Sequence, residues 1–111
     1  YRGAFLAEEE SEAWPVAVRE RLRGRLIHAL VAFGEQLEGA GELDAAIAAY
    51  QRGLDADPIV EPFYQGLMRC YQRLQRHTEA IAAYRRLKQI LSVTLGLAPS
   101  AATEKLYQSL R

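Results

Sequence analysis

The stretch Ala46-Ile47-Ala48-Ala49-Tyr50 recurs unchanged at Ala80–Tyr84. Further positions correspond at the same interval: Arg52 with Arg86, Leu30 with Tyr64, and Leu37 with Tyr71. The corresponding positions are 34 residues apart. A fixed interval of this size is the sequence signature of a repeated structural unit. The 111-residue chain therefore contains two copies of one unit, with further residues on either side.

Apolar residues follow one another at steps of three and four through most of the chain, which predicts helices, and no stretch alternates like a strand. We expect about five helices, near residues 15–37, 42–56, 60–74, 78–95 and 100–110. One face of the first helix carries Val18, Leu22, Leu26, Leu30, Phe33 and Leu37. The helix ends coincide with residues that interrupt or cap helices, namely Gly39, Gly41, Pro58, Gly96 and Ser100.

Two helices within a period of about 34 residues are typical of the tetratricopeptide repeat. We therefore predict an all-α fold, a tetratricopeptide-like array of helical hairpins wound as a right-handed α-solenoid. Residues 1–111 are expected to form one domain, with repeat units at about 27–60 and 61–94 and a capping helix at about 100–110. Within a unit, the small Ala46 lets the two helices approach closely, and Tyr50 packs between that pair and the next.

Composition narrows the class of protein. The 14 basic and 14 acidic residues cancel, whereas nucleic-acid-binding domains usually carry a basic excess. The single Cys70 cannot form an internal disulfide, which favours a reducing, cytoplasmic setting. No apolar run approaches the roughly 20 residues of a membrane span, so we expect no membrane association. Because the chain starts at Tyr1 rather than Met, we expect it to be a piece of a longer protein.

The sequence does not favour an enzyme. His28 and His77 fall in different repeat units, and neither belongs to a metal-binding spacing such as H-E-x-x-H. A glycine-rich phosphate loop would need a preceding strand, which the pattern does not predict. Cys70 lies in a predicted helix, where a small buried hydrophobe is a better interpretation than a nucleophile. We expect no catalytic residue, no cofactor and no metal.

Charged residues are segregated along the chain. Residues 35–57 carry six acids against Arg52, and residues 69–88 carry six bases against Glu79. One interpretation is that solvated helix faces neutralise one another between units. The other is that the chain offers a groove or an edge to a charged partner.

The first helix of each unit lines the concave face of a tetratricopeptide array, which selects the residues of such a groove. In the first unit these positions are His28, Val31, Glu35 and Glu38, and in the second they are Pro62, Gln65, Arg69, Gln72 and Arg73. From them we predict a partner-binding groove formed by His28, Glu35, Gln65, Arg69, Gln72 and Arg73. Arginine suits a bidentate grip on a carboxylate. Alanine at Arg69 and Arg73 is thus expected to weaken partner binding and to leave the thermal transition nearly unchanged.

The two ends of the chain carry a resemblance that the repeats do not. The chain opens with YRGAFL, continues with Trp14 and RERL at Arg19–Leu22, and closes with LGLAPSAATEKLYQSL at Leu95–Leu110. In this order and spacing, the pieces resemble the bacterial transcriptional activator domain over essentially all 111 residues.

The resemblance implies a regulatory role. Such a domain lies C-terminal to a winged-helix DNA-binding domain, in regulators like the antibiotic regulatory proteins of actinobacteria, and usually begins about one helical hairpin before the Tyr-Arg-Gly stretch. It implies a tetratricopeptide-like fold and protein partners: another protomer, which allows a homodimer, transcription machinery, or other domains of the same chain. DNA would be bound only by a domain absent from these residues. The alternative function is a generic tetratricopeptide scaffold that binds an extended peptide and is unrelated to transcription.

Overall fold

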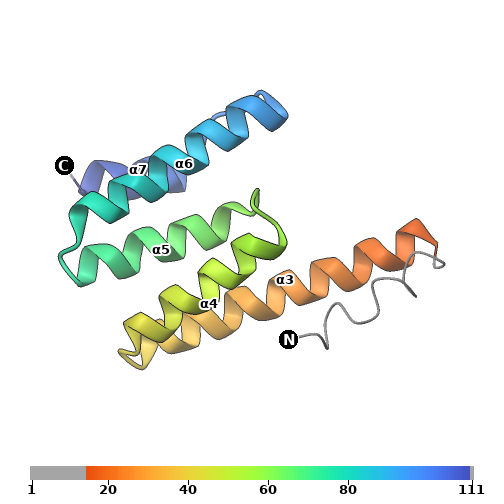
Figure 1. Ribbon diagram of the computed structural model, residues 1–111, viewed down its shortest axis with the longest axis horizontal. Helices are drawn as coiled ribbons and strands as arrows, with labels where there is room; N and C mark the ends of the chain where they lie inside the picture. Colours follow the sequence, from red (N-terminus) through yellow and green to blue (C-terminus); the bar gives the residue numbers. More distant parts are fainter. Residues whose placement is uncertain (1–14, 111) are drawn as a thin grey trace.

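The chain is all-helical over residues 15–110, the part that this computed structural model describes. Its helices are, in order, α3 (Val16–Gly39), α4 (Leu43–Ala56), α5 (Glu61–Arg73), α6 (His77–Leu95) and α7 (Ala101–Ser109). Figure 1 shows α3 to α6 side by side, with successive helices antiparallel. α7 contacts both α5 and α6. This arrangement is the predicted all-α, tetratricopeptide-like array, and the helices begin and end close to their predicted bounds.

The helix ends have the chemical causes that the sequence indicates. The Ser100 side chain caps α7 by accepting a hydrogen bond from the Thr103 amide at 3.4 Å. α6 ends at Gly96, whose φ of 65° lies in the left-handed region that glycine adopts without strain. α4 ends at Ala56, just before Pro58.

The turns inside the two hairpins share one backbone feature at equivalent positions of the repeat. Gly41, between α3 and α4, has φ 80°, and Gln75, between α5 and α6, has φ 61°. Both values lie in the left-handed region, where every residue with a Cβ meets a steric penalty. The second hairpin therefore keeps the turn geometry of the first, although a glutamine stands where the first hairpin has a glycine.

The repeated pentapeptide forms the seams of the core, as its spacing predicts. Ala46 and Ala80 are fully buried, and Tyr50 and Tyr84 are buried with them. The Tyr50 ring lies between two glycines of neighbouring helices, Gly34 of α3 and Gly66 of α5. A Cβ at either glycine would come closer than 3.0 Å to carbon atoms of the ring. No side chain fits at such distances, so both glycines are needed for α3 and α5 to close around the tyrosine.

One face of α3 does not pack as its apolar pattern suggests. Leu22 is 42% exposed and Phe33 is 51% exposed, although both belong to the most apolar stripe of this helix. The helix instead turns Gly34 and Glu38 into the interior. The physical reason is the Tyr50 ring, which admits only a glycine at its closest approach to α3. The predicted stripe is thereby divided: Leu30 and Leu37 pack against the core, whereas Leu22 and Phe33 face solvent.

Some features of the sequence lie outside the described residues. They are the opening YRGAFL and Trp14, and the same holds for the acidic residues between positions 8 and 12.

Candidate functional site

The centre of the array holds a buried carboxylate that joins three helices. Glu38 of α3 is 9% exposed, and its carboxylate accepts a hydrogen bond from the Tyr50 hydroxyl of α4. Arg69 of α5 donates to the same carboxylate through Nε at 3.0 Å and through Nη2 at 2.9 Å. Arg73 Nη1 donates to the Glu38 backbone carbonyl at 3.0 Å. Charge-assisted, bidentate bonds of this kind are among the strongest in proteins.

The protonation of this cluster follows from its contacts. Burial raises the pKa of Glu38, but the hydrogen bonds from Arg69 and Tyr50 outweigh burial and hold the pKa below its usual value. Burial, together with the neighbouring carboxylate, raises the pKa of Tyr50. The cluster is therefore a carboxylate, a guanidinium and a neutral phenol at neutral pH. This set of charges fixes the relative positions of α3, α4 and α5.

A second set of polar contacts holds α7 on α5. Glu61, in the first turn of α5, accepts hydrogen bonds from the Ser100 amide at 2.8 Å and from the Thr103 hydroxyl. Gln65 donates to the Thr103 hydroxyl at 2.9 Å, and Gln72 donates to the Ser109 carbonyl at 3.3 Å. Thr103 is fully buried between these groups. α7 thus covers the side of α5 that carries the two glutamines.

The same helix closes the second hairpin. The Tyr84 hydroxyl donates to Glu104 at 2.8 Å, and the Tyr84 ring stacks on Tyr107 with 4.0 Å between centroids and 8° between planes. Burial, helped by Glu104, raises the pKa of Tyr84 to about 12. Tyr84 therefore meets α7 much as Tyr50 meets α5, which agrees with the predicted position of this tyrosine at the joint between helical pairs.

The six residues predicted to form a groove separate into two sets. Gln65, Arg69 and Gln72 are half-buried, and all three bond to groups of the same chain. The other three, His28, Glu35 and Arg73, are exposed. Arg69 neutralises the buried Glu38. Replacing Arg69 is therefore expected to lower the thermal stability, contrary to the prediction made from the sequence. Partner contact by these residues stays a prediction.

Most of the segregated charges remain open to solvent. Residues 15–110 contain three ion pairs: Arg23 with Asp57, Arg69 with Glu38, and Arg76 with Glu79. One of them, between Arg69 and Glu38, joins the acid-rich residues 35–57 to the base-rich residues 69–88. Neutralisation between units therefore accounts for a small part of the pattern, and the exposed Asp44 and Arg85 lie on surfaces where a partner can reach them.

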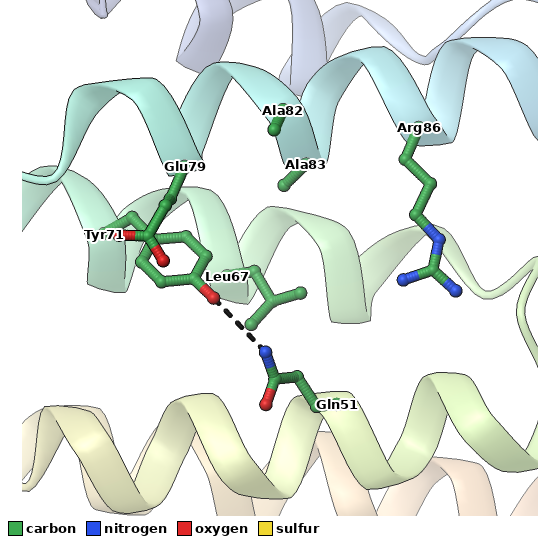
Figure 2. A pocket seen from close by; sticks show the side chains of 7 residues that line it. All are labelled: Gln51, Leu67, Tyr71, Glu79, Ala82, Ala83 and Arg86. Atoms are coloured by element: carbon green, nitrogen blue, oxygen red, sulfur yellow. Dashed lines mark hydrogen bonds between the residues drawn. The ribbon is translucent and has the colours of Figure 1, made fainter.

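A shallow groove of about 210 Å³ lies between α4 and α6, over α5. Figure 2 shows Leu67 at its floor and Gln51 reaching across from α4, where it donates to the Tyr71 hydroxyl at 3.3 Å. Arg86 extends from α6 at the other end, with its guanidinium carbon 5.8 Å from the centroid of the Tyr64 ring. The groove has room for about one large side chain of a partner. The sequence did not predict it, because it forms between helices of different hairpins.

Two chemical features of residues 15–110 bear on candidate sites, namely possible metal ligands and Cys70. Residues 15–110 contain no group of three or more histidine, cysteine, aspartate or glutamate side chains that could hold a metal ion. Cys70 is fully buried, and burial raises the pKa of its thiol to about 11, as expected for a small core residue. Within the same range, no helix is long and apolar enough to cross a membrane.

Fold and site together define an all-helical, tetratricopeptide-like array with a buried ion pair at its centre and charged surfaces open to solvent. The family model of the bacterial transcriptional activator domain matches residues 1–111, and the chain belongs to this family. The family is a regulatory one and not a family of enzymes. Comparisons with curated proteins and with solved structures find no significant match.

Two features of the site escaped the sequence analysis. Glu38 was assigned to an open groove, and no contact was predicted for Thr103, because charged and hydroxyl side chains on a helix usually face solvent. The repeat does contain a signal for Glu38. Gln72 occupies the equivalent position of the next unit, and it stands between Arg69 and Arg73, the two arginines that bond to Glu38.

Proposed function

We propose that this chain is a protein-interaction domain of a bacterial transcriptional regulator, acting in the cytoplasm without catalysing a reaction. The observation that carries the proposal is the family match over residues 1–111. In this proposal, a winged-helix domain outside these residues binds DNA. The helical array meets a protein partner, which is another protomer, the transcription machinery or another domain of the same chain.

The exposed charges of the first helices support this role. His28 and Glu35 on α3 and Arg73 on α5 are exposed, and Arg73 uses one guanidinium nitrogen on the Glu38 carbonyl. Its other terminal nitrogen has no bond to the described residues, so a partner carboxylate can accept from it. Gln65, Arg69 and Gln72 lie beside these residues, and we assign them the dual role of holding the fold and shaping the partner surface.

A reporter assay tests the proposal. Residues 1–111 are fused to an unrelated DNA-binding domain that does not activate transcription by itself, and reporter expression is measured in a bacterial host. The proposal expects more expression than from the DNA-binding domain alone, and it expects His28→Ala/Glu35→Ala/Arg73→Ala to reduce the gain. Circular dichroism of the triple variant must show an unchanged fold. A folded fusion that gives no gain would count against the role in transcription and would favour a generic peptide-binding scaffold.

A further inference from the structure

The groove between α4 and α6 ends at an arginine that no acid of residues 15–110 neutralises. Arg86 is exposed on α6 and forms no ion pair within that range. Its guanidinium lies over the ring of Tyr64, which is fully buried and whose hydroxyl donates to the Pro58 carbonyl at 2.6 Å. A ring held in this way is a fixed platform for a cation, so the guanidinium is positioned at the end of the groove (Figure 2).

The opposite end of the groove shows the same arrangement with its acid in place. Arg76 lies over the ring of Tyr71, 5.0 Å from the centroid, and donates to both carboxylate oxygens of Glu79. Each end thus has a guanidinium above a tyrosine of α5, but at one end alone does a described residue supply the carboxylate. Asp55 of α4 is exposed and forms no ion pair with Arg86. The Arg86 end is therefore open to a carboxylate of a partner.

The middle of the groove is small and mostly apolar. Leu67 of α5 forms its floor, and Ala82 and Ala83 of α6 line one side. Its volume of about 210 Å³ has room for one large apolar side chain. A site for a free small molecule encloses most of its ligand, whereas this groove is shallow. Its shape therefore suits a side chain that another protein presents.

We propose that this groove binds a helix of a partner protein that carries a large apolar side chain and, one turn further along, an acidic one. The inference rests on the proposed interaction role and states the chemistry of the partner. Ala82 and Arg86 lie one turn apart on the same side of α6, and residues one turn apart on the partner helix have the same separation, about 5–6 Å. The apolar side chain covers Leu67 beside Ala82, while the acid accepts hydrogen bonds from the Arg86 guanidinium.

An NMR titration of isotope-labelled residues 1–111 tests the proposal. The probe is a capped helical peptide, rich in alanine and glutamine, with one phenylalanine and one glutamate a helical turn apart. We expect a dissociation constant of about a millimolar, as for one apolar side chain and one exposed ion pair. The amide signals of Gln51, Ala83 and Arg86 should shift. A peptide with glutamine in place of the glutamate should bind about threefold more weakly, and one with serine in place of the phenylalanine at least about tenfold.

Substitutions on α6 separate binding from folding. Arg86→Gln should raise the dissociation constant about threefold. Arg85→Gln is the matched control, because Arg85 is an exposed neighbour that does not line the groove, and it should leave binding unchanged. Ala82→Glu gives Arg86 an acid from its own helix, at the spacing and in the order that favour an ion pair. It should weaken binding at least about tenfold and leave the unfolding midpoint nearly unchanged, because the new pair offsets the loss of alanine.

The outcomes separate this inference from the proposed function. Absence of probe binding up to about 5 mM overturns the groove contact, while activity of the reporter fusion would leave the interaction role intact. Equal binding of the glutamate and glutamine peptides, or equal losses in Arg85→Gln and Arg86→Gln, also overturns it. So does tighter binding of a peptide with lysine in place of the glutamate, which would give the main role to acids of this chain. N-acetylphenylalanine that binds as tightly as the peptide would assign the groove to a free carboxylate and would overturn docking of a protein.

Discussion

Replacing Arg69 with alanine is expected to destabilise the fold, because it removes the charged partner of a buried carboxylate. The side chain of Glu38 is 11% exposed and that of Arg69 is 34% exposed. Removing one member of a buried ion pair costs about 3–5 kcal/mol, whereas an exposed pair contributes about 0–1 kcal/mol. Water can reach the carboxylate through the space that the arginine leaves, and the Tyr50 hydroxyl still donates to it. We therefore expect a loss of about 2–3 kcal/mol, between these limits.

Urea and thermal unfolding, followed by circular dichroism, measure this loss. For a domain of this size, a loss of about 2–3 kcal/mol lowers the midpoint temperature on the order of 10–20 °C. Arg69→Met keeps the aliphatic stem and should show most of the same loss, which separates pairing from packing. Glu38→Gln removes the charge that Arg69 neutralises. The double variant Glu38→Gln/Arg69→Met should therefore lose about 1–2 kcal/mol less than the sum of the single variants.

An exposed ion pair of the same chain provides the control. Glu79 pairs with Arg76 on the surface of α6, where both side chains are nearly half exposed. Glu79→Gln is the same chemical change as Glu38→Gln, and it should leave the unfolding midpoint in place. The reasoning is refuted if Arg69→Ala moves the midpoint no further than Glu79→Gln does, because Glu38 would then behave as a solvated carboxylate.

The remaining predictions concern other points of the fold. Gly66→Ala places a Cβ inside contact distance of an aromatic ring and should cost about 2–3 kcal/mol in urea unfolding, whereas Gly24→Ala, with nothing within 4 Å, should add about 0.5–1 kcal/mol. Gln75→Gly should raise the unfolding midpoint slightly by relieving the left-handed turn, and a lower midpoint would contradict this interpretation. Cys70 should react with iodoacetamide at about pH 8 far more slowly in the native protein than in urea, as mass spectrometry would show, because burial raises its pKa to about 11. Burial raises the pKa of Glu61, but the hydrogen bonds from Thr103 and Ser100 lower it below the usual value of 4.5. The stability that Glu61 contributes to the fold is therefore present above that pH and is lost on acidification. Between about pH 7 and pH 3.5 the midpoint of Glu61→Gln should therefore fall less than that of the wild type.

The sequence allowed the helices and their seams to be predicted because both rest on local rules. The repeat places Ala46 and Ala80 at equivalent seams, and both are fully buried. The ends of the helices follow from single residues such as Gly96 and Ser100, whose geometry depends on their immediate neighbours. Such features need no knowledge of what lies on the neighbouring helix.

The polar contacts of the site could not be predicted in the same way. Glu38 and Arg69 have the sequence pattern of solvent-exposed residues on two different helices, and their pairing needs the distance between α3 and α5. That distance is set by Tyr50 and its two flanking glycines. The dual position of Arg69, on the predicted groove and on a buried carboxylate, follows only when the helices are placed side by side.

The exposed part of the apolar stripe on α3 shows what an apolar pattern can and cannot indicate. Amphipathic analysis finds the face of a helix that avoids water, but it does not say whether the neighbour belongs to the same chain. On α3, the interior needs a glycine beside Tyr50 and an acid beside Arg69, which leaves Leu22 and Phe33 on the other side. Leu30 and Leu37, which belong to the same stripe, are half-buried and pack against the core. The apolar pattern thus locates the buried face of α3 only approximately, and the contacts of Gly34 with Tyr50 and of Glu38 with Arg69 set the final orientation of the helix.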